Sequence, residues 1–265
     1  MSIKISIVTI TYNAERTVRD TFESILRQRF RPLEYIIVDG GSTDSTISII
    51  NDYQVRFKLA GIEIKYKSEK DKGISDAFNK GIAQATGDII GIINADDKLV
   101  DNSLNIIAEA FDPEIGVYYG DCIIFNDSHS QEYLAKPKFS QCESLLRTRM
   151  VLYHPAVFIS RRTYKLYGVY DLELKMCMDR ELLLRFYSNN VKFRYLGQPL
   201  AYYREGGTNQ ANYKKTANEN EMISAKYGMT RIEAKIRKHY WRIHDQLWKI
   251  IQYLNLERIF HKRIV

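Results

Sequence analysis

The order of segments in the first 111 residues constrains the fold of this chain most strongly. Short apolar, β-branched stretches that are typical of strands occupy 3–10, 34–39, 62–67 and 88–93. Stretches with apolar residues at helical spacing follow them, at 14–28, about 42–57, 73–85 and 101–111. The last strand-like stretch, DIIGII, is almost wholly apolar, as expected for a strand covered on both faces. This alternation predicts an α/β fold with a doubly wound, mostly parallel sheet and helices on both faces.

The second half of the sequence is less regular. Strands are predicted at 115–125, 154–160, 191–196 and 199–203, helices at 161–167 and 178–189, and a polar turn at 126–132. Because no stretch rich in Pro, Gly or Ser interrupts this part, residues 1–207 are predicted to form one continuous domain. Residues 208–265 have helical patterns and are predicted to form a helical extension.

Composition argues against several classes of protein. The chain has 265 residues, of which 45% are hydrophobic and 27% charged, which is ordinary for a globular protein and argues against disorder. No apolar stretch approaches the roughly 18 residues that would suggest a membrane span, and the first residues resemble a strand rather than a signal peptide. The cysteines, Cys122, Cys142 and Cys177, form an odd number without metal-like spacing, so we expect reduced thiols and a cytoplasmic location.

The basic charge is concentrated near the C-terminus. The formal net charge is +7. Residues 226–265 contain ten basic and three acidic residues, and this difference of seven accounts for the whole net charge. The preceding part of the chain is formally neutral, so nucleic acid is not expected as a partner.

A helix over 230–265 would be amphipathic. Apolar residues such as Ile243 and Leu247 cluster on one side and basic residues on another, with Trp241 and Trp248 near the boundaries. Such a helix suits the surface of an anionic membrane. It would equally suit packing against the rest of the chain or against a second subunit, and the sequence leaves both alternatives open.

Aspartates lie where three of the predicted strands end. Asp39 ends the second strand, Asp71 follows the third, and Asp96 and Asp97 follow the fourth. The carboxyl ends of parallel strands form one edge of the sheet, which is where ligands of open α/β sheets bind. Carboxylates at such an edge suit Mg²⁺ or Mn²⁺, which bind through one or two carboxylates together with substrate phosphates.

Each of these aspartates also has a plainer interpretation. Asp96 and Asp97 could form a solvated turn that caps the next helix, and Asp39 precedes two glycines, where Asp is a common turn residue. The phosphate-loop patterns GxxxxGK[ST] and GxGxxG are absent. Asp179 lies at the start of the helix-like stretch MDRELLLR, where it is either an N-cap or a general base.

Several motifs together resemble one known family. The segments SIVTITYN, VDGGSTD, DKGISDAFNKGIAQATGD and NADD, in this order and spacing, are similar to those of family-two glycosyltransferases with the GT-A fold. The resemblance runs from Ser6 to Gly207, and within the family it is to bacterial enzymes of O-antigen, capsule or exopolysaccharide assembly. It implies a nucleotide-binding half at about 1–97 and an acceptor-binding half at about 98–207.

The resemblance also implies roles for individual residues. Positions that bind the nucleoside of the sugar donor are matched by Thr9, Tyr12, Asp39 and Asp71. Asp96 and Asp97 match the DXD-type motif, in which the first carboxylate faces ribose or metal and the second binds Mg²⁺ or Mn²⁺. Asp179 matches the catalytic base, and His154 matches a histidine ahead of a strand on the acceptor side.

The sequence departs from the family pattern at three positions. Phe78 stands where many members have an arginine, so a positive charge near the donor is missing unless Lys72 or Lys80 replaces it. Met178 precedes the matched base, where an acidic residue is usual. A histidine near the end of the domain in some members is replaced by Arg204, which we expect to contact the donor diphosphate as a fixed cation. The alternative for this arginine is a surface ion pair.

The resemblance implies metal-dependent, inverting transfer of a sugar from a nucleotide-diphosphate sugar to an acceptor hydroxyl. The donor is expected to be a UDP-sugar, and the acceptor a growing surface polysaccharide linked to polyprenyl diphosphate at the inner face of the cytoplasmic membrane. A non-catalytic nucleotide-sugar-binding or membrane-docking module, or a sugar nucleotidyltransferase, is the alternative. A nucleotidyltransferase would need a basic, Gly-rich loop after the first strand. A glycoside hydrolase would need two carboxylates flanking one bond, a pairing that the tandem aspartates do not suggest.

Overall fold

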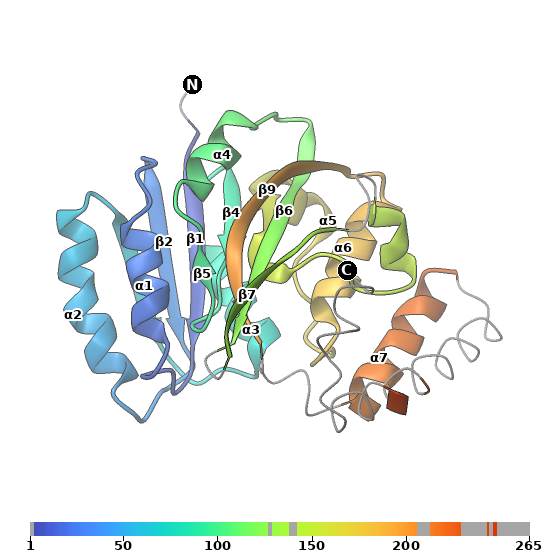
Figure 1. Cartoon of the computed structure of the whole chain (residues 1–265), viewed down its shortest axis with the longest axis horizontal. Coiled ribbons are helices and arrows are strands. Elements are labelled where there is room, and N and C mark those ends of the chain that lie inside the picture. Colours follow the sequence, from blue (N-terminus) through green and yellow to red (C-terminus); the bar gives the residue numbers. More distant parts are fainter. Residues whose placement is uncertain are drawn as a thin grey trace.

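The first four strands build one half of a sheet in which all neighbours are parallel (Figure 1). The computed structural model describes residues 3–126, 129–137, 142–205 and 213–228, together with Ile243, Gln246 and Leu247. The elements of this half are β1 (Ile5–Thr11), α1 (Val18–Leu26), β2 (Leu33–Asp39), α2 (Thr46–Leu59), β3 (Glu63–Ser68), α3 (Ile74–Gln84) and β4 (Ile89–Ile92). They follow the predicted alternation to within a few residues, so the predicted doubly wound α/β fold is confirmed.

The strand order β3-β2-β1-β4 brings the carboxyl ends of four strands to one edge of the sheet. In register, Thr11 of β1 lies opposite Asp39 of β2, and Asp39 lies opposite Ser68 of β3. Because parallel strands end at the same edge, the loops that follow these strands are neighbours. The topology therefore gathers the predicted site residues that lie at or after the ends of these strands.

The second half of the chain continues the sheet with mixed pairing. Its elements are β5 (Lys98–Leu99), α4 (Ser103–Glu109), β6 (Ile115–Asn126), β7 (His129–Ala135), η1 (Cys142–Arg147), η2 (His154–Ala156), β8 (Val157–Ser160), α5 (Arg161–Tyr167), α6 (Met178–Ser188), β9 (Lys192–Arg204) and α7 (Tyr213–Lys226), where η marks a 3₁₀ helix. β8 lies antiparallel between β4 and β6, and β9 runs parallel to β6. Consequently β1 to β4, β6 and β9 share one direction, and β5, β7 and β8 run in the other.

Two sequence predictions for this half are wrong in detail. The stretch predicted as a polar turn at 126–132 contains the start of β7, which begins at His129 and pairs antiparallel with β6. The strands predicted separately at 191–196 and 199–203 are one strand, β9, whose register with β6 shifts near Pro199. A polar stretch can form a strand at an outer edge, and proline is tolerated where the ladder of hydrogen bonds is interrupted.

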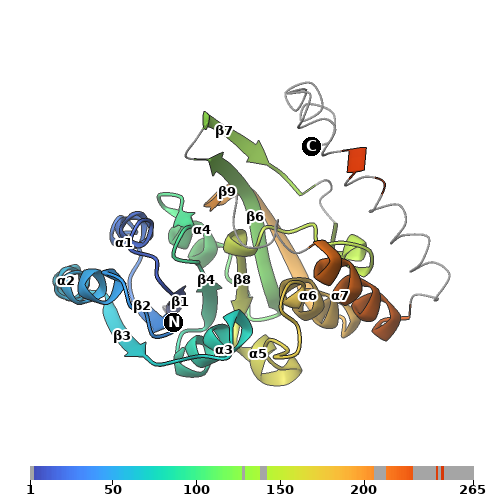
Figure 2. The ribbon, with the colours of Figure 1, turned by 90° about the horizontal axis from the view of Figure 1, so that it is seen from below.

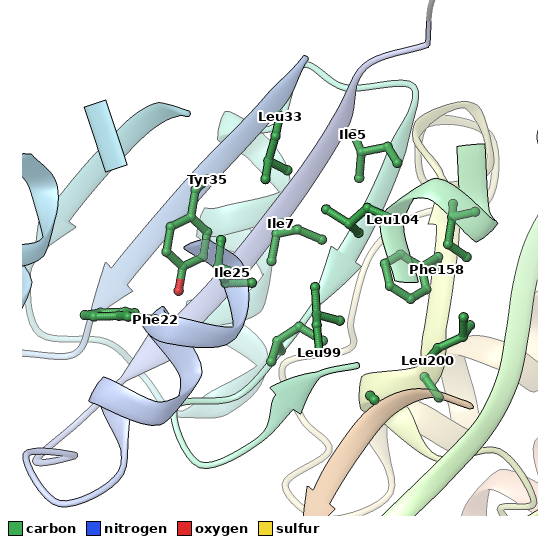
Figure 3. Packing of buried hydrophobic residues seen from close by; sticks show 14 of the residues in the cluster. Ile5, Ile7, Phe22, Ile25, Leu33, Tyr35, Leu99, Leu104, Phe158 and Leu200 are labelled. Carbon is green, nitrogen blue, oxygen red and sulfur yellow. The ribbon is translucent and has the colours of Figure 1, made fainter. Parts of the chain in front are cut away.

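Two hydrophobic cores lie on opposite faces of the sheet. One face is covered by α1, α2 and α4 (Figure 2). There the rings of Phe22, Tyr35 and Phe57 meet with centroids 4.9 to 6.0 Å apart, and Figure 3 shows Phe22 and Tyr35 within this core. On the other face, α3, α5 and α6 cover a second cluster that includes Val8. α3 packs closely on β1 there, because a Cβ at Gly81 would clash with the Val8 side chain.

α7 packs against α6 through buried charged side chains. The Arg180 guanidinium is almost completely buried and donates to the side chains of Asn220 and Ser224 on α7, at 2.8 and 2.9 Å. The Glu181 carboxylate, also buried, accepts from the Lys226 ammonium at 2.8 Å. Leaving the buried charges of Arg180 and Glu181 without these partners would be costly, so α7 is an integral part of the fold that precedes it.

Three further expectations concern membrane spans, the cysteines and the domain boundary. Among the described residues, no helix has the length and apolar character needed to cross a membrane. Cys122 and Cys177 are buried, free thiols. The predicted domain boundary after residue 207 lies within a stretch outside the described residues.

A buried carboxylate pins β2 to its neighbours at the amino-terminal edge of the sheet. Glu34 is fully buried and accepts hydrogen bonds from the Lys65 ammonium (2.6 Å), the Thr86 backbone N–H (2.8 Å) and the Ser6 hydroxyl. Burial alone would raise the pKa of Glu34, but these donors outweigh it and lower the pKa to about 2.

We expect Glu34 to make stability depend on acid pH. Because the pKa of its carboxyl falls from the ordinary 4.5 to about 2 on folding, the carboxylate stabilises the protein above about pH 4.5. This contribution is lost as the pH falls towards 2, and its full size is about 3 kcal/mol. Urea unfolding of the wild type and of E34Q as a function of pH measures it. The stability gap between the two should shrink below about pH 4.5, and a constant gap would contradict the assignment.

Candidate active site

The loops after β1, β2 and β3 meet at the carboxyl edge of the sheet. A Cβ at Gly40 would clash with the Asp71 carboxylate and would lie 3.5 Å from the Tyr12 ring, so glycine leaves the room that both side chains need. Tyr12 is 66% exposed, and Asp71 is half-buried, with Oδ1 accepting from the Gly73 backbone N–H at 2.8 Å. Two of the predicted donor-binding residues therefore lie together at the surface.

Asp39 lies behind this surface. Its carboxylate is fully buried and accepts hydrogen bonds from the hydroxyls of Thr11 (2.8 Å) and Ser68 (2.7 Å) and from the backbone N–H of Ser42 (2.9 Å). Burial raises the pKa of Asp39, but these donors, with the Ser42 hydroxyl, lower it overall. Asp39 thus has a structural role, because it fixes the turn after β2 that borders the site. A direct contact between Asp39 and a nucleoside stays a prediction.

Thr9 does not lie with Tyr12 and Asp71. Its side chain is fully buried, and its hydroxyl accepts a hydrogen bond from the Tyr35 hydroxyl at 2.9 Å. Tyr35 belongs to the core beneath α1 and α2. The structure therefore places Thr9 inside the sheet layer, and its predicted role in donor binding stays a prediction.

Asp96 and Asp97 follow β4 at the same edge. Asp97 is 1% exposed, and its two oxygens accept from the Arg204 backbone N–H (3.0 Å) and the Asn94 side-chain amide (3.1 Å). Asp96 is less deeply buried. Burial raises the pKa of both carboxyls, and the negative charge of Asp96 raises that of Asp97 further. The raised values indicate that the described neighbours compensate the two charges incompletely.

This carboxylate pair fits a divalent cation. A cation would offset both the burial of Asp96 and Asp97 and their mutual repulsion. Among the described residues, no group of three or more His, Cys, Asp and Glu side chains is arranged to hold a metal. Mg²⁺ and Mn²⁺ are accommodated by fewer protein ligands, because donor phosphates and water complete their coordination.

Arg204 approaches the pair from β9. Its Nε donates to the backbone carbonyl of Asp96 at 3.2 Å, in addition to the contact of its backbone N–H with Asp97. Its guanidinium lies 4.6 Å over the Phe125 ring and 3.6 Å from the Asp20 carboxylate. A cation is therefore held beside the aspartates, with an acidic neighbour as well, and its contact with a diphosphate stays a prediction.

Asp179 begins α6 and faces His154 and Tyr170. His154 Nε2 lies 3.7 Å from Asp179 Oδ1 and 3.2 Å from the Tyr170 hydroxyl. The imidazole stacks on Phe78, with ring centroids 5.1 Å apart. Asp179 is 25% exposed as a side chain, yet its Oδ1 is buried and accepts no hydrogen bond from the described residues. The residues predicted as base and as acceptor-side histidine are thus neighbours.

Tyr203 connects the two acidic parts of the site. It is half-buried on β9, and its ring lies 6.0 Å from that of Tyr153. Burial raises the pKa of Tyr203 to about 12, assisted by the charges of Asp97 and Asp96 and, more weakly, of Asp179. The next residue, Arg204, contacts Asp97 through its backbone N–H, and Tyr153 immediately precedes His154, the neighbour of Asp179. Tyr203 therefore links the aspartate pair to the Asp179 part of the site.

α7 fixes the start of α6 from outside. The Glu219 carboxylate is 6% exposed and accepts from the backbone N–H groups of Lys175, Met176 and Cys177 at 2.9 to 3.0 Å. These residues lead directly into the first turn of α6, which carries Asp179. The position of Asp179 therefore depends on a helix that lies after residue 207.

At the position where many family members have an arginine, Phe78 supports the His154 ring by stacking on it. Lys80 is engaged elsewhere, because its ammonium lies 3.2 Å from the carboxylates of both Glu69 and Asp76. Lys72 is exposed. Neither lysine is thus held in the place that the family arginine would occupy.

Sequence reasoning missed Tyr203, Tyr170 and Glu219. Tyr203 immediately precedes Arg204, and this adjacency to a predicted site residue was the one available signal. Nothing local marks Tyr170 or Glu219, because each acquires its role through contacts with residues far away in the sequence. Of the predicted helix at 230–265, the structure describes Ile243, Gln246 and Leu247 alone, so membrane or subunit docking stays a prediction.

Comparison with known proteins identifies relatives along most of the chain. The model of glycosyl transferase family 2 matches residues 6–168. The PGL/p-HBAD biosynthesis glycosyltransferase of Mycobacterium bovis is 28% identical over 238 residues, which cover 88% of this chain and 90% of the relative. An uncharacterized glycosyltransferase of Nostoc is 28% identical over 236 residues, which cover 86% of this chain and 72% of the relative.

Solved structures share the fold at low sequence identity. S. aureus TarS in complex with UDP-GlcNAc has a TM-score of 0.64 at 18% identity, covering 85% of this chain and 71% of that one. The mannosyltransferase PcManGT from Pyrobaculum calidifontis, in complex with GDP-Man and Mn²⁺, has a TM-score of 0.64 at 17% identity, covering 90% and 69%. The chain spans 43% of a longer TarS chain. These likenesses confirm the GT-A fold.

We expect the loss of the Glu219 carboxylate to destabilise the protein. E219A leaves three backbone N–H groups at the start of α6 without their acceptor, so the free energy of unfolding should fall by at least about 2 kcal/mol. Urea unfolding measures the change. M222A, which shortens an exposed side chain of the same helix, is the matched control and should stay near the wild type. Equal stability of the two variants would refute the role of Glu219.

Proposed function

The chain belongs to glycosyl transferase family 2, and we propose that it transfers a sugar from a nucleotide-diphosphate sugar to an acceptor hydroxyl with inversion at the anomeric carbon. The observation that carries this proposal is the chain of contacts that links two acidic groups through Tyr203. Its neighbour Arg204 contacts Asp97 of the Asp96–Asp97 pair, and its ring contacts Tyr153, which precedes the Asp179 neighbour His154. The pair suits a diphosphate with its cation, and a single carboxylate suits a proton acceptor. The sugar to be transferred would lie between them, against the Tyr203 ring.

On the donor side, the nucleoside would contact Tyr12 and Asp71, which are grouped around Gly40. The diphosphate would then extend along the carboxyl edge of the sheet towards Asp96, Asp97 and the Arg204 guanidinium. A bound Mg²⁺ or Mn²⁺, held by the two aspartates, would neutralise the charge that builds on the departing diphosphate. UDP-sugars and GDP-sugars are the first candidates, because the TarS and PcManGT structures contain UDP-GlcNAc and GDP-Man.

On the acceptor side, Asp179 would take the proton of the acceptor hydroxyl as that oxygen attacks the anomeric carbon. Its side chain is 25% exposed, so an acceptor can reach the carboxylate. Attack from the face opposite the departing diphosphate inverts the configuration. General-base assistance of this kind contributes roughly 10²–10⁴-fold to the rate.

For the acceptor we propose a surface-polysaccharide glycan linked to polyprenyl diphosphate, at the inner face of the cytoplasmic membrane. The +7 charge of residues 226–265 supports this proposal, because basic segments are attracted to anionic lipid surfaces. Ile243 and Leu247, which belong to the apolar side of the predicted helix, are 57% and 54% exposed. Docking of this helix on the membrane would bring the site to a lipid-linked acceptor.

The two alternative functions have less support. A sugar nucleotidyltransferase needs a basic phosphate-binding loop after β1, whereas here Asn13 holds that loop to the next turn. The Asn13 backbone N–H donates to the Ser42 hydroxyl (2.9 Å), and its side-chain oxygen accepts from the Thr43 N–H (2.8 Å). A non-catalytic binding module would have no need for a carboxylate at position 179, so it accounts for less of the site than a transferase does.

We expect one class of nucleotide to raise the melting temperature, because a ligand that binds only the native state stabilises it. UDP, UDP-GlcNAc, GDP and GDP-mannose are tested with and without Mn²⁺, and EDTA should reverse the metal-dependent part. D96N should abolish the effect of Mn²⁺. G40A should abolish nucleotide binding, because the added Cβ displaces Asp71.

D52N is the matched control for this panel. It removes an exposed carboxylate on α2 and should respond to nucleotide as the wild type does. The donor site would be wrongly assigned if D96N and G40A responded like D52N. It would be equally wrong if none of the four nucleotides changed the melting temperature under any condition.

We expect D179N to separate binding from catalysis. Its nucleotide-dependent thermal shift should match the wild type, while transfer should fall by roughly 10²–10⁴-fold because the proton acceptor is lost. The rate of nucleoside diphosphate release from the donor measures this fall. D171N, which removes a carboxylate from the preceding loop, is the control. Near-normal turnover by D179N would exclude Asp179 as the base.

A further inference from the structure

The Asp179 carboxylate has a buried oxygen that lacks a hydrogen-bond donor among the described residues. This oxygen is Oδ1, and the arrangement destabilises a charged carboxylate. The small cavity beside it is lined mainly by apolar side chains of β4, β8 and α6, including Ile92, Val157 and Leu182. In apolar surroundings, a single hydrogen bond to a charged oxygen is stronger than it would be in water.

His154 is the neighbour that can supply this hydrogen bond. Its Nε2 lies 3.7 Å from Asp179 Oδ1, slightly beyond hydrogen-bond distance, and the two side chains line the same cavity. The imidazole is 13% exposed, and its ring lies nearly parallel to that of Phe78, at 21°. A small displacement of either side chain into the cavity would bring the two atoms into contact.

Tyr170 contacts the same nitrogen of His154 that faces Asp179. Its hydroxyl is 3.2 Å from His154 Nε2, and burial raises the pKa of Tyr170, assisted by the nearby Asp179 carboxylate. The backbone of Tyr170 is itself fixed by the Asn79 side chain, which donates to the Tyr170 carbonyl (2.8 Å) and accepts from its N–H (2.9 Å). α3 therefore supports both members of the pair, because it carries Phe78 beneath the imidazole and Asn79 against the Tyr170 backbone.

Apart from Arg180, whose guanidinium is directed away to Asn220 and Ser224 of α7, the other titratable groups around Asp179 are neutral near pH 7. They are Tyr164 of α5, Tyr170 of the following loop, Cys177 before α6 and Tyr203 of β9. Burial raises the pKa of each, so none carries a charge at neutral pH. Within the described part of the chain, His154 contributes the one basic nitrogen found within 4.0 Å of the Asp179 carboxylate.

We propose that His154 and Tyr170 form a positioning pair for Asp179. In this arrangement, which rests on the proposed transfer reaction, the Nε2–H group of His154 donates to Asp179 Oδ1. The Tyr170 hydroxyl oxygen accepts from the same Nε2–H in a shared, three-centre hydrogen bond. It thereby fixes the imidazole so that the other oxygen of Asp179 is presented to the acceptor hydroxyl. The pair stabilises the ionised carboxylate, which is the form that accepts a proton. Neither residue touches the reacting atoms.

The test compares Y170F, H154F and H154Q with Y118F. Y170F removes one hydroxyl, and H154F keeps an aromatic ring on Phe78 but removes the donor. H154Q restores a neutral N–H donor. Y118F is the matched control, because Tyr118 is a buried tyrosine whose hydroxyl binds the Asp112 backbone, away from Asp179. The measured quantity is the pH dependence of UDP or GDP release from UDP-GlcNAc or GDP-mannose.

We expect Y170F and H154F to lower kcat about tenfold, with KM for the donor unchanged. The acid limb of their kcat profiles should move to higher pH, because the carboxylate loses a donor to its charged form. H154Q should recover most of the rate, and Y118F should match the wild type in both quantities. Wild-type rates and pH profiles in Y170F and H154F, with melting temperatures unchanged, would overturn the proposal.

A second measurement does not depend on turnover. The NMR chemical shifts of the His154 imidazole, assigned with H154Q, should differ between D179N and the wild type at the same pH, because Nε2–H loses its charged acceptor. D52N should leave these chemical shifts unchanged. Unchanged chemical shifts in D179N would overturn the positioning pair, even if neither donor is turned over. Full activity of D179N would instead refute the proposed transfer mechanism, so the two failures are distinguishable.

Discussion

Two buried carboxylates pin the strand β2 to its neighbours, one near each end. At the amino-terminal edge, Glu34 accepts from groups on β1, on β3 and just before β4. At the carboxyl edge, Asp39 accepts from the ends of β1 and β3 and from the turn that follows β2. If one strand slid past another, both carboxylates would lose their donors, so these hydrogen bonds fix the register of the strands. The loops at the carboxyl edge then have one arrangement, in which Tyr12 and Asp71 meet at Gly40.

The other half of the site is fixed by different means. Asp179 lies at the start of a helix, and the cavity beside it is lined by side chains of β4, β8, α5 and α6 and by His154 and Tyr170. Glu219 fixes the position of the first turn of α6. His154, which stacks on Phe78, and Tyr170, which is held by Asn79, lie next to the Asp179 side chain and restrict its direction. The proposed transfer requires the donor carbon and the acceptor oxygen to be held about 3–3.5 Å apart. In the proposed reaction, the sheet edge would hold the donor and the start of α6 would hold the acceptor.

The parts of the fold that could be predicted are those set by local pattern. The alternation of strands and helices before residue 100 depends on nearby residues, and so does the position of Asp96 and Asp97 after an apolar strand. The pairing of β7 and the continuity of β9 through Pro199 depend on the long edge of β6, which no local pattern describes. The inward direction of Asp39 could not be predicted either, because a turn and a ligand site favour the same residue type at that position. The role of Glu219 could not be predicted from local sequence, because its partners lie more than forty positions earlier in the chain.

The contact between Glu219 and the start of α6 has a consequence for how chains of this kind can be recombined. A chimera that takes its segment after residue 207 from another protein would inherit a different acceptor, or none, for the N–H groups that precede Asp179. Unless the face of α7 that carries Glu219, Asn220 and Ser224 is transplanted with it, the new segment would disturb the proposed base while leaving the predicted nucleotide-binding half intact. In evolutionary terms, the segment after residue 207 could diverge freely only outside that one helical face.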